Sequence, residues 1–204
     1  MRRTYPGVPF ERYADDIVIH CKSEEQTLSI HRNLKERMTA CKLELHPEKT
    51  KIAYCKDANR RGNYDTVSFD FLGYTFRPRL SKNRMGQYFV NFSPAISQKA
   101  VVRIFGVIRD WQFNSRIPMD LEDLAKLANP AIRGWINYYG RFCPSAMHSL
   151  MMYLNQKLVK WAMRKYKRFR FHEKRATHWL GKIAHREPGM FVHWKCGYKP
   201  STGQ

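Results

Sequence analysis

The stretch from Phe10 to Ile19 reads FERYADDIVI and places two adjacent carboxylates, Asp15 and Asp16, between apolar residues. Two acids at a turn, followed by a β-branched run, predict a hairpin whose second strand is buried on both faces. Carboxylate oxygens are the ligands that Mg²⁺ prefers, and one or two of them can form a site together with substrate phosphates. The alternative is a turn in which the aspartates have no chemical role.

The overall charge favours a polyanionic partner. The 204 residues include 37 Lys and Arg against 17 Asp and Glu, which gives a formal net charge of +20 at pH 7. After Leu124 there are 16 of these bases but only two of the acids, Glu173 and Glu187. Because Lys and Arg that neutralise phosphates release condensed counterions, we expect nucleic acid to bind mainly to this C-terminal part. A membrane surface is the second candidate.

Composition excludes several classes of protein. Hydrophobic residues make up 43% of the chain and aromatic residues 14%, so the chain is expected to fold. The sequence has no run of about 18 apolar residues, so we expect that no segment spans a membrane, and nucleic acid rather than a membrane is the expected partner. The five cysteines are scattered and form no CxxC pair, so we expect free thiols and a cytoplasmic location.

The first 80 residues combine strand patterns with one helix. A capping box at Ser23 predicts the start of a helix that is expected to end at Pro47. Residues 50–55 have the pattern of a strand, and residues 67–76 that of a strand or a tight hairpin.

From about residue 94 the apolar residues recur at helical spacing. Helices are expected to begin at Pro94, at Asp120, at Asn129 and near Ser145. Along the last of these helices, four bases at steps of three and four predict a basic rail on one side: Lys157, Lys160, Arg164 and Lys167. We interpret this rail as a surface that contacts RNA. The alternative is an ordinary solvated face of the helix.

Four blocks of the chain resemble one family. The YADD motif at residues 13–16 resembles the palm motif of reverse transcriptases, and its context RYADDIVI is most similar to that of group II intron-encoded proteins. LELHPEKTKI at 43–52 and FDFLGYTF at 69–76 resemble the next two blocks, the second of which forms the primer grip. NPAIRGWINYY at 129–139 resembles the core of the maturase-specific domain, the thumb-like domain X. Other bacterial reverse transcriptases share the YADD block but not this last one.

The resemblance implies an α+β fold. Residues 1–80 would be the C-terminal part of a reverse transcriptase palm, a short antiparallel sheet with one helix. Residues 81–168 would form an α-helical thumb or maturase-specific domain X, and residues 169–204 a basic C-terminal tail.

The resemblance also assigns roles at the polymerase site. Asp15 and Asp16 would be the catalytic residues that bind Mg²⁺, with Asp16 the less essential partner. Tyr13 and Ala14 would line the nucleotide and primer side. Lys49 would lie near the leaving pyrophosphate, and the alternative for it is a solvated loop lysine.

Further positions correspond to primer and RNA contacts. The primer 3′ end would be positioned by three residues of the third block: Leu72, Gly73 and Tyr74. Intron RNA would be bound by the basic rail and by three residues in or next to the fourth block: Arg133, Tyr138 and Arg141. Trp135 is expected to belong to the core, because it shares an apolar face with Ile132 and Tyr139.

A two-metal polymerase site needs a further carboxylate from a strand before the YADD hairpin, and here only residues 1–12 precede that hairpin. We therefore expect a C-terminal part of a reverse transcriptase/maturase that binds intron RNA to assist splicing. It would carry part of an RNA-directed DNA polymerase site that is inactive alone and is completed by an N-terminal fragment in trans. Target DNA is a further candidate partner. The alternative is a non-catalytic RNA-binding fragment or an inactive remnant.

Overall fold

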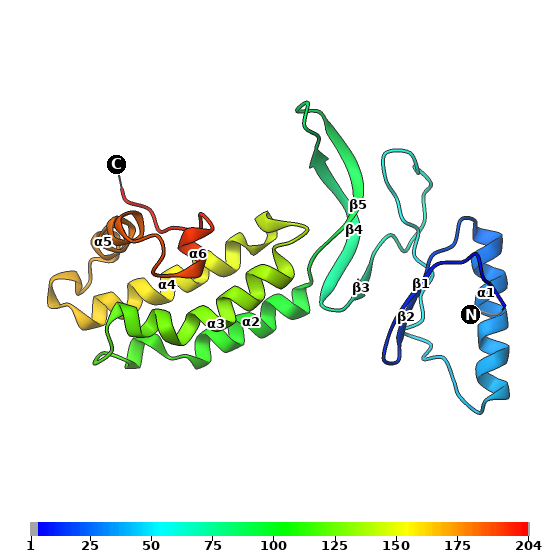
Figure 1. Cartoon of the computed structure of the whole chain (residues 1–204), viewed down its shortest axis with the longest axis horizontal. Helices are drawn as coiled ribbons and strands as arrows, with labels where there is room; N and C mark the ends of the chain where they lie inside the picture. The colour runs from blue at the N-terminus through cyan, green and yellow to red at the C-terminus, as the bar shows by residue number, and fades with distance from the viewer. Residues whose placement is uncertain (1–3, 204) are drawn as a thin grey trace.

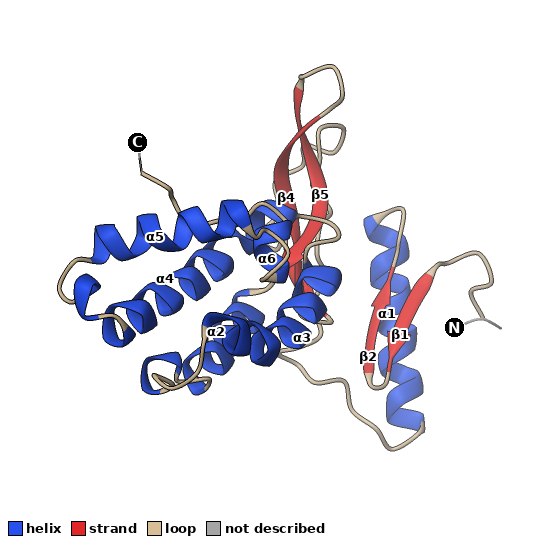
Figure 2. Ribbon diagram, turned by 60° about the vertical axis from the view of Figure 1, so that its left-hand side comes forward, coloured by secondary structure: helices blue, strands red, loops and turns tan. Residues whose placement is uncertain are grey.

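The computed structural model describes residues 4–203, in which two differently packed parts follow one another along the chain (Figure 1). The N-terminal part holds a small hairpin, one long helix and extended loops. The C-terminal part is a helical bundle around a continuous apolar core. A long hairpin lies between the two parts and projects beyond the helices (Figure 2). The predicted α+β class is confirmed.

The N-terminal part begins with the two-stranded antiparallel sheet of β1 (Phe10–Tyr13) and β2 (Asp16–Ile19), followed by α1 (Glu24–Ala40). The predicted N-cap is confirmed, because the Ser23 side chain accepts a hydrogen bond from the Gln26 amide at 3.2 Å. The reciprocal bond of a capping box is shifted by one residue, since Gln26 Oε1 accepts from the Lys22 amide at 2.8 Å. The predicted end of the helix at Pro47 is wrong. Lys42 adopts a left-handed conformation with φ of 58°, which stops the helix at Ala40.

Little apolar surface is buried in this part. Ile30 is its one buried residue within residues 4–73. Ile17 in β2 is 37% exposed, so the prediction of a strand buried on both faces is wrong. The reason is that β2 pairs only with β1 among the described residues. Residues 50–55 do not form the predicted strand, and a two-stranded hairpin alone gains little stability in water.

The second sheet is an antiparallel meander in the order β3–β4–β5, formed by β3 (Phe69–Phe71), β4 (Tyr74–Lys82) and β5 (Tyr88–Ile96). The tight hairpin predicted around Gly73 is confirmed. The predicted helix start at Pro94 is wrong, since Pro94 lies in β5 opposite Phe76. The predicted domain division after residue 80 falls inside β4, where a cut would separate paired strands.

The helical part contains α2 (Gln98–Asp110), α3 (Leu121–Tyr139), α4 (His148–Lys165), α5 (Glu173–Arg186) and α6 (Val192–Lys195), with short 3-10 helices η1 (Phe113–Ser115), η2 (Pro144–Met147) and η3 (Lys167–Phe169). The predicted cap at Asp120 is confirmed as a capping box with Asp123. Pro130 lies inside α3, so the two helices expected from Asp120 and Asn129 are one continuous helix.

The core is built around α4, which contacts α2, η1 and α5. The apolar residues that recur along α4 at helical spacing form a stripe that is fully buried: Leu150, Met151, Leu154, Leu158, Trp161 and Ala162. Burying a large aliphatic side chain of this kind stabilises a fold by about 1.5–3 kcal/mol. The helical part therefore has the apolar burial that the N-terminal part lacks.

The residues predicted to form a basic tail are ordered as α5 and α6 and pack onto the bundle. Phe191 and Trp194 are completely buried. Asn155 on α4 joins this segment to the core through hydrogen bonds to His193, Trp194 and the Tyr198 carbonyl. These four residues form the Asn155 clamp, which makes the C-terminal segment part of the domain.

Two further predictions concern the state of the cysteines and the hydropathy of the helices. All five cysteines are free thiols. Every helix within residues 4–203 is too short or too polar to span a bilayer.

Candidate nucleic-acid interface

Asp15 and Asp16 lie at the closed end of the β1–β2 hairpin. Tyr13 pairs with Asp16 across the strands, so Ala14 and Asp15 form a two-residue loop. Ala14 has φ of 52°, a left-handed conformation that short hairpin loops require, and its carbonyl accepts a hydrogen bond from Arg12 Nε at 2.9 Å. Both carboxylates and the Tyr13 ring are exposed. The structure thus places these four predicted site residues at one accessible tip.

The two carboxylates suit only part of a metal site. Within residues 4–203, no three His, Cys, Asp or Glu side chains are grouped so that they could hold a metal ion. Mg²⁺ keeps several waters and accepts substrate phosphates as ligands. Asp15 and Asp16 therefore fit a site that is completed by bound nucleic acid. Lys49 is exposed in a turn between α1 and β3, where its amide donates a hydrogen bond to the His46 carbonyl at 3.2 Å.

The predicted primer-grip turn has an unusual backbone. Leu72 and Gly73 link β3 to β4 with φ of 50° and 78°, the two positive values of a type I′ loop. Glycine adopts this conformation without strain, whereas Leu72 takes it at a cost of about 1–2 kcal/mol. A Cβ at Gly73 would lie 2.9 Å from the Tyr139 hydroxyl. Close packing against α3 therefore requires glycine at this position.

Three tyrosines attach this turn to the end of α3. The Tyr138 hydroxyl donates a hydrogen bond to the Leu72 carbonyl at 2.8 Å, and the Tyr74 hydroxyl donates one to the Tyr138 carbonyl. The Tyr139 hydroxyl accepts a hydrogen bond from Arg103 Nη2 at 3.2 Å. Burial raises the pKa of both Tyr74 and Tyr138 above the ordinary tyrosine value. Tyr74, Tyr138 and Tyr139 form the tyrosine cluster.

Tyr138 thus has a structural contact that the sequence does not reveal. Its ring is still 46% exposed, and its hydroxyl is bound to Leu72. Next to it, Arg141 is exposed and its guanidinium lies 5.8 Å from the ring of Phe142, which is 56% exposed. Phe142 is a candidate contact that the sequence analysis misses, although it directly follows a predicted RNA-binding arginine.

The other predicted RNA contacts lie on the helices. Arg133 is exposed on α3, and Trp135 is partly buried and stacks on Trp111 with ring centroids 5.5 Å apart, as expected of a core residue. On the basic rail, Lys157 is half-buried with its Nζ 4.8 Å from the Tyr153 ring. Lys160 and Arg164 are exposed on α4. Lys167 is also exposed, but the prediction that it continues the same helix is wrong, because α4 ends at Lys165 and Lys167 lies in η3.

Two families match separate regions of this sequence. Residues 1–76 match the family described as "Reverse transcriptase (RNA-dependent DNA polymerase)". Residues 103–179 match the family described as "Group II intron, maturase-specific domain". The chain belongs to the group II intron reverse transcriptase/maturase family. It corresponds to the C-terminal part of such a protein. A search of curated proteins finds no match.

The two matched regions of this reverse transcriptase/maturase meet at the tyrosine cluster. Tyr74 belongs to the reverse transcriptase region, and Tyr138 and Tyr139 belong to the maturase-specific domain. The Asn155 clamp in turn connects the maturase-specific domain to residues beyond its matched region. Contacts within the chain therefore join the predicted primer-grip turn to the maturase-specific domain, and that domain to the C-terminal segment.

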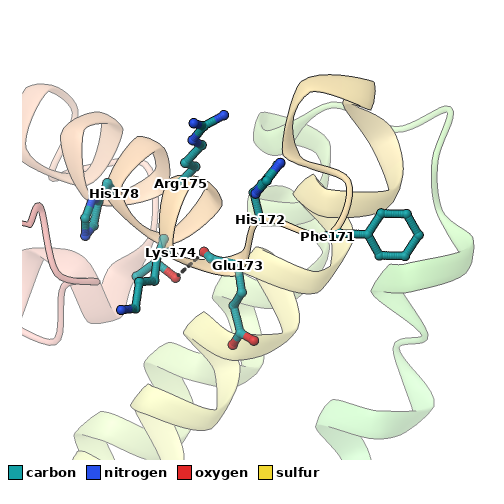
Figure 3. A pocket seen from close by; sticks show the side chains of 7 residues that line it. Phe171, His172, Glu173, Lys174, Arg175 and His178 are labelled. Atoms are coloured by element: carbon teal, nitrogen blue, oxygen red, sulfur yellow. Dashed lines mark hydrogen bonds between the residues drawn. The ribbon is translucent and has the colours of Figure 1, made fainter.

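The sequence analysis predicts Lys167 and a basic tail from residue 169, but it does not reveal that bases and aromatics gather at one corner between α4 and α5. Residues 166–175, the α4–α5 corner, read YKRFRFHEKR and include five exposed bases with one acid: Lys167, Arg168, Arg170, Lys174 and Arg175, with Glu173. Figure 3 shows the Phe171 ring pointing away from α5, and Phe171 is one of the residues that line the hollow beside the first turn of that helix. The alternation of basic and aromatic residues was the available signal, but it lacks the helical period on which the predictions rely.

Proposed function

We propose that the maturase-specific domain of this protein binds group II intron RNA and so assists splicing. The match of residues 103–179 to the maturase-specific family carries this proposal. The exposed bases of the domain supply the physical means, because each phosphate that they neutralise releases a counterion.

The charges of the basic rail are available for such contacts. Within residues 4–203, Lys160, Arg164 and Lys167 take part in no salt bridge. The neighbouring Lys165 differs, since its Nζ lies 2.6 Å from Asp120 Oδ1 and also donates a hydrogen bond to the Met119 carbonyl. Lys165 therefore serves the fold. Arg164 Nη1 also donates a long hydrogen bond to the Asn114 carbonyl at 3.5 Å, but none of the three exposed bases of the rail has its charge neutralised by an acid, so all three remain available for phosphate contacts.

A filter-binding titration tests this function. Wild-type protein is titrated against a group II intron RNA and an unrelated RNA of equal length, at two salt concentrations. We expect tighter binding to the intron RNA. Equal affinity for the two RNAs would reduce the protein to a general basic RNA binder.

The same titration with variants locates the surface. Removing the three exposed bases of the rail together should lower the salt slope by about 2–3, since each phosphate contact contributes about 0.7–0.9. The matched control removes three exposed bases of α1, which lies outside the maturase-specific domain: Arg32, Lys35 and Arg37. If the control variant loses as much intron affinity as the rail variant, the rail has no special role.

We further propose that the YADD hairpin is part of an RNA-directed DNA polymerase site. The reverse transcriptase match over residues 1–76 supports this, together with the exposed tip that carries Asp15 and Asp16. These two aspartates would hold Mg²⁺, and Leu72 and Gly73 would position the primer end. When bound, Mg²⁺ would activate the attacking hydroxyl and stabilise the leaving oxygen.

The exposure of β2 supports a protein partner for this hairpin. The apolar side chain of Ile17 is exposed to water, and the second edge of β2 is unpaired among the described residues. Such an edge readily accepts another strand. The partner that we propose is an N-terminal reverse transcriptase segment supplied in trans. Template-dependent DNA synthesis should then require that segment and be abolished by Asp15→Asn, whereas Glu11→Gln, on the exposed part of β1, should keep it. Synthesis that survives Asp15→Asn would contradict the assignment.

A further inference from the structure

Phe171 is the most exposed large apolar side chain that the structure describes, at 84%. It also has φ of 64°, a left-handed conformation that is strained for a residue with a Cβ. The corner thus presents a large ring to water from a strained backbone. Neither property helps the domain to fold, which points to a role in contact with another molecule.

The surrounding contacts hold the corner in this shape. Phe169, two residues earlier, is buried, with its ring centroid 5.3 Å from that of Trp179 on α5. The Phe169 carbonyl accepts a hydrogen bond from the His172 amide at 2.9 Å, which closes the turn around Phe171. One aromatic residue therefore fixes the corner to the core while the next is held outside it.

Two arginines of the corner lie over aromatic rings. The Arg170 guanidinium is 5.2 Å from the centroid of the Phe171 ring, and that of Arg168 is 4.6 Å from the Phe169 ring. Such contacts order a guanidinium and leave its donor edge free for a phosphate. Neither arginine forms a salt bridge within the described residues. An aromatic face and a phosphate-binding group thus lie side by side.

This pairing fits an unpaired nucleotide better than a duplex. A base inside a helix is covered on both faces by its neighbours, whereas an unpaired base can stack on an exposed ring. A lipid headgroup would also match the charge. RNA is favoured because Lys167 belongs to both the corner and the basic rail, so the positive surface continues onto the domain proposed to bind intron RNA.

We propose that the α4–α5 corner binds an unpaired nucleotide, with its base stacked on Phe171 and its phosphate held by Arg170. This site rests on the proposed RNA-binding function and specifies which feature of the RNA is bound. Stacking of one base on an aromatic side chain contributes about 1–3 kcal/mol, which corresponds to about 5- to 150-fold in affinity.

The test compares two probes on the full chain, a single-stranded RNA and a blunt RNA duplex with the same number of phosphates. Phe171→Gly removes the ring and suits the positive φ, so the fold is kept. We expect this variant to bind the single strand at least fivefold more weakly and the duplex as wild type does. Phe171→Trp should restore single-strand binding. Tyr88→Ala removes an exposed aromatic ring from β5 and serves as the matched control, with no change expected.

Three other results would overturn either the corner site or the proposed function. If Phe171→Gly binds the single strand as tightly as wild type while wild type prefers intron RNA, the corner site is wrong and the proposed function stands. If wild type shows no preference for intron RNA, the proposed function fails first. If Phe171→Gly abolishes binding to phosphatidylserine vesicles but not to RNA, the corner is a membrane contact and the nucleotide site is overturned.

Discussion

Replacing Asn155 with leucine removes a buried amide that makes three hydrogen bonds to the C-terminal segment. Asn155 is 4% exposed, and its Oδ1 accepts from His193 Nε2 at 2.8 Å and from Trp194 Nε1 at 2.9 Å. Its Nδ2 donates to the Tyr198 carbonyl at 3.0 Å. Leucine has a similar shape but leaves two donors and one acceptor without partners. Since each such group costs about 1–3 kcal/mol, we expect Asn155→Leu to lower the free energy of unfolding by at least about 3 kcal/mol.

Urea unfolding followed by circular dichroism measures this loss. Asn137→Leu, at an exposed position of α3, is the matched control and should change stability by less than about 0.5 kcal/mol. Hydrogen exchange then locates the effect, because loss of the clamp should speed exchange of the amides in residues 191–198. A loss below about 1 kcal/mol, with these amides still protected, would refute the role given to the clamp.

Three further predictions concern other contacts. Burial lowers the pKa of His193 to about 3, so the unfolded state binds a proton that the folded state does not. Stability should therefore fall as pH drops from about 6.5 towards 3, by up to about 1.4 kcal/mol per pH unit, and urea unfolding of His193→Gln should lack this component. Tyr138→Phe should cost about 1 kcal/mol and speed amide exchange in the turn at Leu72, and unchanged exchange would contradict the contact. Gly181→Ala should lower the thermal midpoint because its Cβ would overlap a backbone carbonyl, whereas Gly134→Ala, in open space, should raise it through helix propensity.

Local signals in the sequence predict much of the fold correctly. The caps at Ser23 and Asp120 depend on hydrogen bonds within a few residues, and the stripe of α4 depends only on helical period. The errors arise where distant contacts decide. Pro94 lies in a strand because β4 pairs with that segment, and Pro130 remains inside a long helix.

In the candidate site, too, the features set by neighbouring residues were predictable and those set by distant contacts were not. The two tight turns follow from their short motifs, because Gly73 and the aspartate pair are turn signals in themselves. The bond from Tyr138 to Leu72 joins residues far apart in sequence, and helical spacing cannot reveal it. The ordered C-terminal segment depends on the burial of Trp194 against α4, which an aperiodic sequence hides.

Splicing of a group II intron RNA at limiting Mg²⁺, with and without this protein, tests the central proposal most directly. We expect wild-type protein to accelerate splicing, and the variant lacking Lys160, Arg164 and Lys167 to accelerate it much less at the same concentration. A splicing rate that wild-type protein leaves unchanged, at concentrations where it binds the intron RNA, would contradict the maturase function.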